Sequence, residues 1–462
     1  MADLLDKLPP YSLEAEMAVL GCMLIEKEAL ERALELLDEA SFYKDNHQKI
    51  FSVIKHLSMH DHVVDTVTVA EELRRQQLLL MIGGGEYITQ LIDSVTTAAH
   101  IDAYANIVKQ KETLRSLMRS ATQIVEKCYK EAEDSDQLLD EAEKLIYDIA
   151  DKRNREGLQP VSKMLHEMVE NLEQLHQRKE TVTGIPTGIK RFDEMTTGLQ
   201  KGNLVILAAR PGVGKTALAL SFAVHAAVQK KLPVAIFSLE MSQQEIGMRL
   251  LSSVTGIPLQ QLRTGFFKKN DWPNITRKAE LLSQSPIYLD YSSSAISILT
   301  LRSAARRLAI QLKNKGTPLA LIMIDYLQLM QGSRKNPESR QNEIAEISRS
   351  LKGLARDLDL PIVALSQLNR SPEERGRDGK PQLSDLRESG AIEQDADLVG
   401  FIYREGMYKK NTENMTPEEY DSMMRHAKLI IAKQRNGPLG EIDLTFIKEC
   451  ARFENMEMES VG

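Results

Sequence analysis

Residues 209–216 read Ala-Arg-Pro-Gly-Val-Gly-Lys-Thr, the composition of a loop that binds phosphate groups. An apolar run at residues 204–208 precedes this loop, and a helix-compatible segment follows it. A strand, a glycine-containing loop and a helix in this order direct backbone N–H groups at phosphate oxygens. Lys215 would add positive charge near the β- and γ-phosphates, and the Thr216 hydroxyl is a suitable Mg²⁺ ligand. The pattern therefore predicts a site for nucleotide phosphates and Mg²⁺.

The residues expected to bind the nucleotide are consecutive: Gly212, Val213, Gly214, Lys215, Thr216 and Ala217. Ala209 stands where this motif usually has its first glycine. Alanine is small enough to end a strand, so the departure costs little where φ is negative. The alternative is a glycine-rich turn that ends by chance in Gly-Lys-Thr, and the flanking strand and helix argue against it.

Three other apolar runs end in a polar side chain: residues 234–239 precede Glu240, residues 319–324 precede Asp325, and residues 361–366 precede Gln367. Functional groups of parallel sheets collect at the carboxyl ends of strands. We expect Asp325 to organise Mg²⁺ and Glu240, on a strand expected beside the first, to orient and deprotonate the attacking water. Gln367 could sense the γ-phosphate. A lone strand-terminal acid often only caps a helix, but the combination with the phosphate loop favours catalysis.

Two cations, Lys433 and Arg435, lie just after an apolar run at residues 428–432. On an extended strand, residues two apart point to the same face. Two cations there could reach the γ-phosphate of a neighbouring subunit, as arginine fingers do. The alternative is a solvated basic hairpin, which these residues alone favour.

Two polar, basic segments follow the Asp325 and Gln367 strands, at residues 332–340 and 369–390. Neither contains an aromatic platform for stacking bases, so contact with DNA phosphates fits them better than sequence recognition. Ordinary solvated loops are the alternative for each segment taken alone. Their position beside the expected catalytic strands favours a functional role.

The pattern of apolar and polar residues along the chain changes near residue 183. Residues 1–152 read as an all-helical interaction domain without catalytic residues, and residues 153–182 as a linker containing one amphipathic helix. From residue 183 to 462, short apolar runs alternate with helical segments. This alternation predicts an α/β domain with a largely parallel sheet covered on both faces, followed by an antiparallel addition.

The linker helix is expected over residues 162–178, where Leu165, Met168, Leu172 and Leu175 recur at helical spacing. Polar segments flank this helix, so its apolar stripe needs a covering surface. Docking on a neighbouring subunit and packing back on the same chain both satisfy that need.

Composition fits a protein of two or three globular domains: 462 residues, 42% hydrophobic and 27% charged. No membrane span or secretory signal is expected, and three scattered cysteines without metal-ligand spacing indicate a reducing cytoplasm. The net charge of −7 does not suggest nucleic-acid binding. It does not exclude it, because a ring can be basic only along its channel.

The motifs together resemble the DnaB family of bacterial replicative helicases. The resemblance rests on residues 183–188, 197–199, 209–216, 237–242, 324–329, 365–370 and 385–390, and on residues 9–16 and 47–51 near the N-terminus. It therefore covers almost the whole chain. It implies a RecA-like P-loop ATPase domain behind an all-α collar and a linker helix that docks on the adjacent subunit.

The family resemblance also implies a homohexamer that encircles one DNA strand and uses ATP and Mg²⁺ for 5′→3′ translocation at the replication fork. The implied partners are single-stranded and forked DNA, primase and a helicase loader. By motif position, Lys433 and Arg435 match the pair that acts in trans. Arg387, Glu388 and Gly390 match the DNA-contacting loop, where Glu388 would act through its backbone N–H or by orienting Arg387.

Two other functions remain open at this point. A strand-exchange recombinase has the same ATPase core, but the long helical N-terminal domain argues against it. A ring scaffold that uses ATP only for assembly would not need a catalytic base, and this chain has Glu240.

Overall fold

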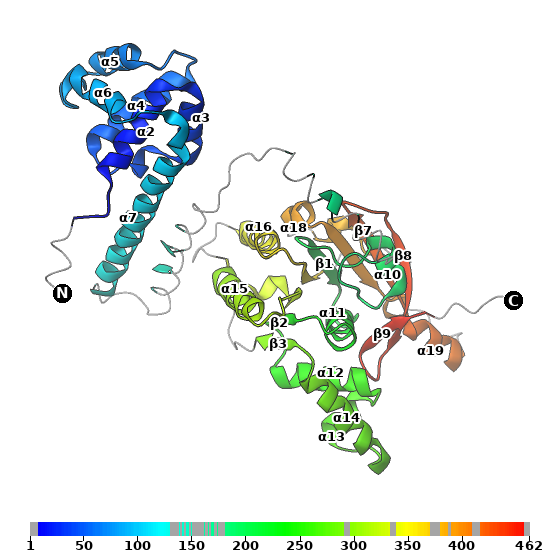
Figure 1. Ribbon diagram of the computed structural model, residues 1–462. Coiled ribbons are helices and arrows are strands. Elements are labelled where there is room, and N and C mark those ends of the chain that lie inside the picture. The colour runs from blue at the N-terminus through cyan, green and yellow to red at the C-terminus, as the bar shows by residue number, and fades with distance from the viewer. Residues whose placement is uncertain are drawn as a thin grey trace. The chain divides into compact units, whose positions relative to one another are not determined.

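The computed structural model describes residues 8–129, 181–290, 296–332, 339–369, 379–386, 390–408 and 416–456, with isolated helical positions between 138 and 173. The chain divides into two compact units, Met1–Val169 and Glu170–Gly462 (Figure 1). Most of the linker helix expected at 162–178, including Leu172 and Leu175, lies outside the described residues. The domain boundaries at 152 and 182 therefore stay predictions.

The described part of the first unit is helical throughout, as predicted. Its main helices are α2 (Leu13–Ile25), α3 (Lys27–Leu36), α4 (Asp45–Met59), α5 (Thr66–Arg75), α6 (Gly84–Asp93) and α7 (Ile101–Tyr129). The Ser12 side chain caps α2 by accepting a hydrogen bond from the Ala15 N–H. The core is apolar, with Leu20, Phe51 and Ile54 fully buried.

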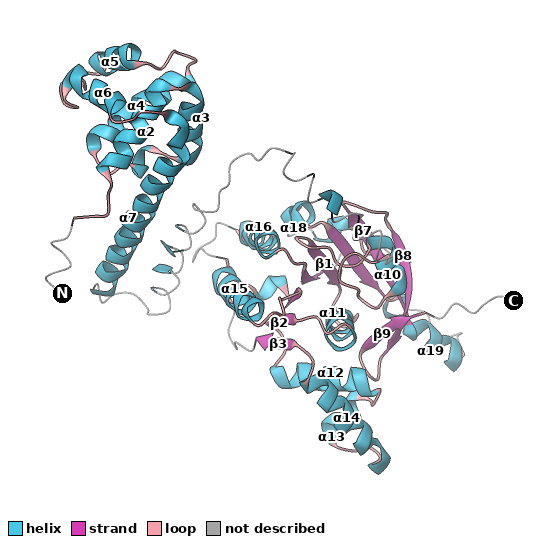
Figure 2. Ribbon diagram, in the orientation of Figure 1, coloured by secondary structure: helices cyan, strands magenta, loops and turns pink. Residues whose placement is uncertain are grey.

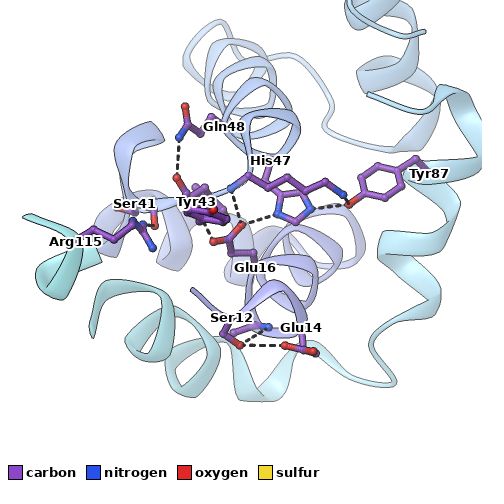
Figure 3. Close-up of polar contacts among 12 residues, drawn as sticks. Ser12, Glu14, Glu16, Ser41, Tyr43, His47, Gln48, Tyr87 and Arg115 are labelled. Atoms are coloured by element: carbon purple, nitrogen blue, oxygen red, sulfur yellow. Dashed lines mark hydrogen bonds and ion pairs between the residues drawn. The ribbon is translucent and has the colours of Figure 1, made fainter. Parts of the chain in front are cut away.

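A buried polar chain also runs through this helical unit (Figure 3). Glu16 Oε2 lies 2.7 Å from His47 Nδ1, and His47 Nε2 lies 2.7 Å from Tyr87 Oη. The other carboxylate oxygen of Glu16 accepts the Tyr43 N–H at 2.7 Å. Because Glu16 and His47 are buried, these bonds satisfy groups that would otherwise be costly. They fix α2, α4 and α6 against one another.

The second unit is built on a sheet, whose strands are magenta in Figure 2. Its described strands follow the order β3-β2-β4-β5-β1-β6-β7-β8-β9. The strands are β1 (Leu204–Ala209), β2 (Val234–Ser238), β3 (Ile287–Asp290), β4 (Leu321–Asp325), β5 (Ile362–Gln367), β6 (Leu398–Tyr403), β7 (His426–Gln434), β8 (Gly440–Ile447) and β9 (Arg452–Asn455). Strands β1 to β6 pair in parallel, and β7 to β9 add antiparallel pairs. The α/β fold and the antiparallel addition are as predicted, whereas β9 was not expected.

One expectation about the sheet was wrong. The strand before Glu240, β2, does not lie beside β1, because β4 and β5 stand between them. Strand order is set by how crossover helices pack on the sheet. The sequence of a buried apolar strand does not indicate which strand it pairs with.

Helices cover both faces of this sheet. The described helices of this unit are α10 (Lys190–Thr196), α11 (Lys215–Val224), α12 (Gln243–Thr255), α13 (Leu259–Thr264), α14 (Trp272–Ser283), α15 (Ile298–Asn314), α16 (Arg340–Leu358), α18 (Gly390–Asp395) and α19 (Pro417–Arg425). Alternate β1 side chains enter two cores: Val205 and Leu207 pack with α11, and Leu204 and Ile206 pack with α15 and α16. Figure 1 shows α11 apart from α15 and α16. This packing holds the carboxyl ends of the central strands in a fixed layer.

Candidate nucleotide site

The loop after β1 has the backbone of a phosphate cradle. Gly212 and Gly214 adopt φ values of 78° and 116°, which favour glycine. Gly214 is the N-cap of α11, and a Cβ there would lie 3.0 Å from the Phe453 ring. Val213 and Ala217 are buried in the core, so they could contact phosphate only through backbone groups. The predicted binding residues thus surround the N-terminus of α11, where anions are stabilised.

Gln367 lies directly beside this loop. It ends β5 and pairs with Ala209, the last residue of β1. The Ala209 carbonyl oxygen also accepts the Leu368 N–H at 3.1 Å. Ala209 has no positive φ, so the alanine in place of glycine is unstrained. The structure therefore brings the expected sensor to the start of the phosphate loop.

Asp325, at the end of β4, faces the first residues of α11. Its Oδ2 accepts a 2.6 Å hydrogen bond from Thr216 Oγ1, and its Oδ1 lies 3.4 Å from Lys215 Nζ. Asp325 is 5% exposed, and its Oδ1 has no hydrogen-bond partner among the described residues. A buried carboxylate oxygen next to a threonine hydroxyl suits Mg²⁺, which prefers few protein oxygens together with phosphates and water. The donor set fits the ion.

Glu240 also lies near Lys215 and Asp325, because the strand before it, β2, pairs with β4. β2 pairs with β4 so that Ser238 lies opposite Asp325, and the Leu239 N–H donates to the Asp325 carbonyl oxygen at 2.7 Å. Glu240 Oε2 then lies 3.6 Å from Lys215 Nζ, and half of its side chain is exposed. The carboxylate is both near the phosphate loop and open to water.

The contact between Tyr326 and Lys215 was not predicted from the sequence, although Tyr326 directly follows Asp325. Lys215 Nζ lies 3.8 Å from the centre of its ring, a cation–π contact. Burial and the charges of Glu240 and Asp325 raise the pKa of the Tyr326 hydroxyl, so it stays protonated. Tyr326, Asp325 and Glu240 together hold the Lys215 ammonium group.

Arg435 lies far from this cluster, at the opposite end of the strands. It follows β7, whose last residue Gln434 pairs with Leu398 at the start of β6. Leu398 in turn pairs with Val205, near the start of β1. The phosphate loop follows the opposite end of β1.

Lys433 and Arg435 both contact the carboxyl end of α18. Lys433 Nζ donates to the carbonyl oxygens of Glu393 and of Ala396, the latter at 2.8 Å. Arg435 Nη2 donates to the Gln394 carbonyl oxygen at 2.7 Å. Burial and the neighbouring Arg435 charge lower the pKa of Lys433. The two cations therefore share one face, as their spacing predicts.

The candidate DNA segments are described in part. Gly390 begins α18, whereas Arg387 and Glu388 lie outside the described residues. Gly332 and Arg340 flank the other segment, of which residues 333–338 also lie outside. No helix in the described part of the chain combines the length and apolar content that crossing a bilayer requires.

Two family models match the chain. The DnaB-like helicase N terminal domain matches residues 8–110, and the DnaB-like helicase C terminal domain matches residues 184–455. The chain belongs to the DnaB family of replicative helicases. It is therefore an ATP-dependent DNA helicase, of the hexameric type that moves 5′→3′ on single-stranded DNA and separates strands at the replication fork.

Relatives and solved structures agree with this family. The replicative DNA helicase DnaC of Bacillus subtilis is 45% identical over 99% of this chain and 97% of its own length. DnaB of Geobacillus stearothermophilus is also 45% identical, over 98% and 96%. A solved DnaB-like replicative helicase, described with its interactions with primase, has a TM-score of 0.72 at 33% identity and covers 96% of this chain and 100% of its own. A second solved structure, of an ATPase domain alone, has a TM-score of 0.58 at 37% identity and covers 65% and 100%. The resemblance at the level of motifs is thus confirmed, and the recombinase and scaffold alternatives lose support.

Proposed function

We propose that this helicase hydrolyses ATP at a site completed by two subunits. One subunit supplies the phosphate loop, Glu240, Asp325 and Gln367, and the next supplies Lys433 and Arg435. The observation that carries the proposal is the position of Arg435 at the end of the strands opposite to Lys215. A cation placed there serves a neighbour's γ-phosphate better than its own.

Within this site each side chain has one task. Backbone N–H groups of residues 212–217 and the Lys215 ammonium group hold the ATP phosphates. Thr216 and Asp325 would hold Mg²⁺, which when bound neutralises charge on the β- and γ-phosphates. Glu240 accepts a proton from the attacking water, and its exposure leaves room for that water. Lys433 and Arg435 stabilise the charge that develops on the γ-phosphoryl group.

Hydrolysis then moves DNA through the segments that follow β4 and β5. Gln367 contacts the γ-phosphate and passes its loss to residues 369–390. Arg387, Glu388 and Gly390 contact the phosphate backbone of the strand in the ring. Such contact is independent of base sequence, as a replicative helicase requires.

The N-terminal unit is proposed to bind primase as a collar. The solved relative described above with primase supports this assignment. A helicase loader and location at nucleoid replication forks are also proposed, by family resemblance. The polar chain of Glu16, His47 and Tyr87 would stiffen the collar rather than take part in chemistry.

Unwinding of forked DNA tests the proposal directly. Forks with a free 5′ tail and forks with only a 3′ tail are compared with ATP and Mg²⁺ present. Unwinding that needs the 5′ tail, ATP and Mg²⁺ together, and that Lys215→Ala abolishes, is the expected result. Unwinding by Lys215→Ala at the wild-type rate would reject the site.

A further inference from the structure

Strand β5 extends further than its partner β4. The ladder between them ends where Ile324 pairs with Ala364, because the chain leaves the strand direction after Asp325. β5 continues to Gln367, and β1 pairs with it on the other side. The last part of β5, which carries the proposed sensor, therefore has no strand on its β4 side.

The side chain of Gln328 fills that place. Its Nε2 donates to Ser366 Oγ at 2.9 Å and to the Gln367 carbonyl oxygen at 3.2 Å. Its Oε1 accepts the Gln367 N–H at 3.2 Å. One amide thus bonds both backbone groups of Gln367, as a neighbouring strand would. The opposite amide orientation would lose both bonds.

The backbone of Gln328 connects this amide to the first candidate DNA segment. Gln328 lies in a 3₁₀ turn, η5 (Leu327–Leu329), and its carbonyl oxygen accepts a 2.8 Å hydrogen bond from Arg340 Nη2. Arg340 Nη1 also pairs with Glu343, whose Oε1 accepts the Gly332 N–H at 2.8 Å. Gly332 and Arg340 flank residues 333–338, so this network ties both ends of the segment to η5.

Glu343 is charged in this network. Burial alone would raise its pKa, but the hydrogen bonds from Gly332 and Arg340 outweigh burial and lower it. A buried carboxylate with both oxygens occupied holds its partners in place.

We propose that Gln328 is a positioning residue that couples Gln367 to Gly332 and Arg340, which flank the first candidate DNA segment. The inference rests on the proposed function, in which Gln367 senses the γ-phosphate. A displacement of the Gln367 backbone strains its two hydrogen bonds to the Gln328 amide, and η5 carries that displacement to Arg340. Arg340, at the end of the candidate DNA segment after β4, thereby responds to a sensor on β5, and Gln328 itself touches neither nucleotide nor DNA.

The test compares DNA affinity in two nucleotide states. Full-length wild type and Gln328→Leu are titrated against fluorescein-labelled oligo-dT, with a non-hydrolysable ATP analogue or with ADP. The larger of the two dissociation constants of wild type for DNA, divided by the smaller, measures the coupling, and the same ratio is formed for each variant. We expect Gln328→Leu to reduce this ratio by roughly 2- to 30-fold, the range known for residues that link two sites. Gln311→Leu, an exposed change on α15, should leave the ratio unchanged.

Two further variants separate coupling from general damage. Gln328→Glu keeps the acceptor for the Gln367 N–H but loses the donor, so it should reduce the ratio even if Gln328→Leu fails to fold. Arg340→Gln should also reduce the ratio, and the double variant with Gln328→Leu should add little, because both changes break one path. A merely structural role would lower the melting temperature without changing the ratio.

The outcomes are distinct. A wild-type ratio that Gln328→Leu and Gln328→Glu leave unchanged would overturn the coupling role while the proposed function stands. Fully additive effects of Gln328→Leu and Arg340→Gln would also overturn it. In a third outcome, DNA does not change the ATP hydrolysis rate of the wild type, and nucleotide does not change its DNA affinity. That result would overturn the proposed function and this inference together.

Discussion

Lys215 and Arg435 lie at opposite ends of the strands of one sheet. Lys215 follows the carboxyl end of β1, and Arg435 follows Gln434, which pairs beside the amino end of β1. At about 3.3 Å per residue, the length of β1 separates these two ends by roughly 17 Å. A head-to-tail ring brings two different surfaces of neighbouring subunits together, so a site that uses both ends of the strands is completed by two subunits. The fold thus makes the proposed site depend on assembly.

Replacing Glu240 with glutamine tests the catalytic base. The amide keeps the size of the side chain but cannot accept the proton from water. We expect kcat for ATP hydrolysis to fall by about 10²- to 10⁴-fold while ATP binding is kept. Steady-state hydrolysis and equilibrium binding of a fluorescent ATP analogue measure the two effects. Glu280→Gln, an exposed change on α14, is the control, and normal turnover by Glu240→Gln would reject the assignment.

Thr216 gives a test of the Mg²⁺ site. Thr216→Ala removes the hydroxyl that donates to Asp325 Oδ2 and would ligate the ion. We expect the Mg²⁺ concentration for half-maximal hydrolysis to rise at least about tenfold. Thr216→Ser keeps the hydroxyl and should behave as wild type. Equal Mg²⁺ requirements for the alanine and serine variants would count against this ligand.

The phosphate loop should not tolerate a side chain at Gly214. Gly214→Ala places a Cβ 3.0 Å from the Phe453 ring and at a φ of 116° that other residues avoid. Strain of about 1–3 kcal/mol should weaken nucleotide binding roughly 5- to 150-fold. Gly247→Ala is the matched control, because a Cβ there meets no other atom within 4 Å. Unchanged ATP affinity in Gly214→Ala would show that the loop is not the cradle.

The lowered pKa of Glu343 predicts a pH-dependent stability. A carboxyl with a lowered folded-state pKa stabilises the protein above its unfolded pKa of about 4.3, and this contribution is lost as pH falls through the folded value. Because the Arg340 partner is 41% exposed, the contribution should be only about 1 kcal/mol. Glu343→Gln should melt a few degrees below wild type at pH 7, with the difference vanishing in acid. A difference that stays constant with pH would contradict the charged state.

The local sequence pattern predicted most strands of the α/β domain. The order of the strands and the contacts between distant residues depend on tertiary packing, which the local pattern does not contain. The runs that became β1, β4, β5 and β6 were predicted within two residues, because strands buried on both faces are continuously apolar. The placement of β2 was not predictable, since each buried run can pair with any other. Strand β9 is four residues long, and only Phe453 in it is buried. The bonds from Gln328 to Gln367 cross 39 positions of sequence and leave no periodic signal.

Mixed rings test the two-subunit site most directly. Lys215→Ala lacks the phosphate-binding cation and Arg435→Ala lacks the cation of the neighbour, so each pure protein should lose hydrolysis by roughly 10³-fold. In rings mixed from both variants, some interfaces pair an intact Lys215 with an intact Arg435. We predict that mixing restores DNA-stimulated ATP hydrolysis well above that of either pure variant. Mixed rings no more active than the pure proteins, or a pure Arg435→Ala ring with wild-type hydrolysis, would contradict the account.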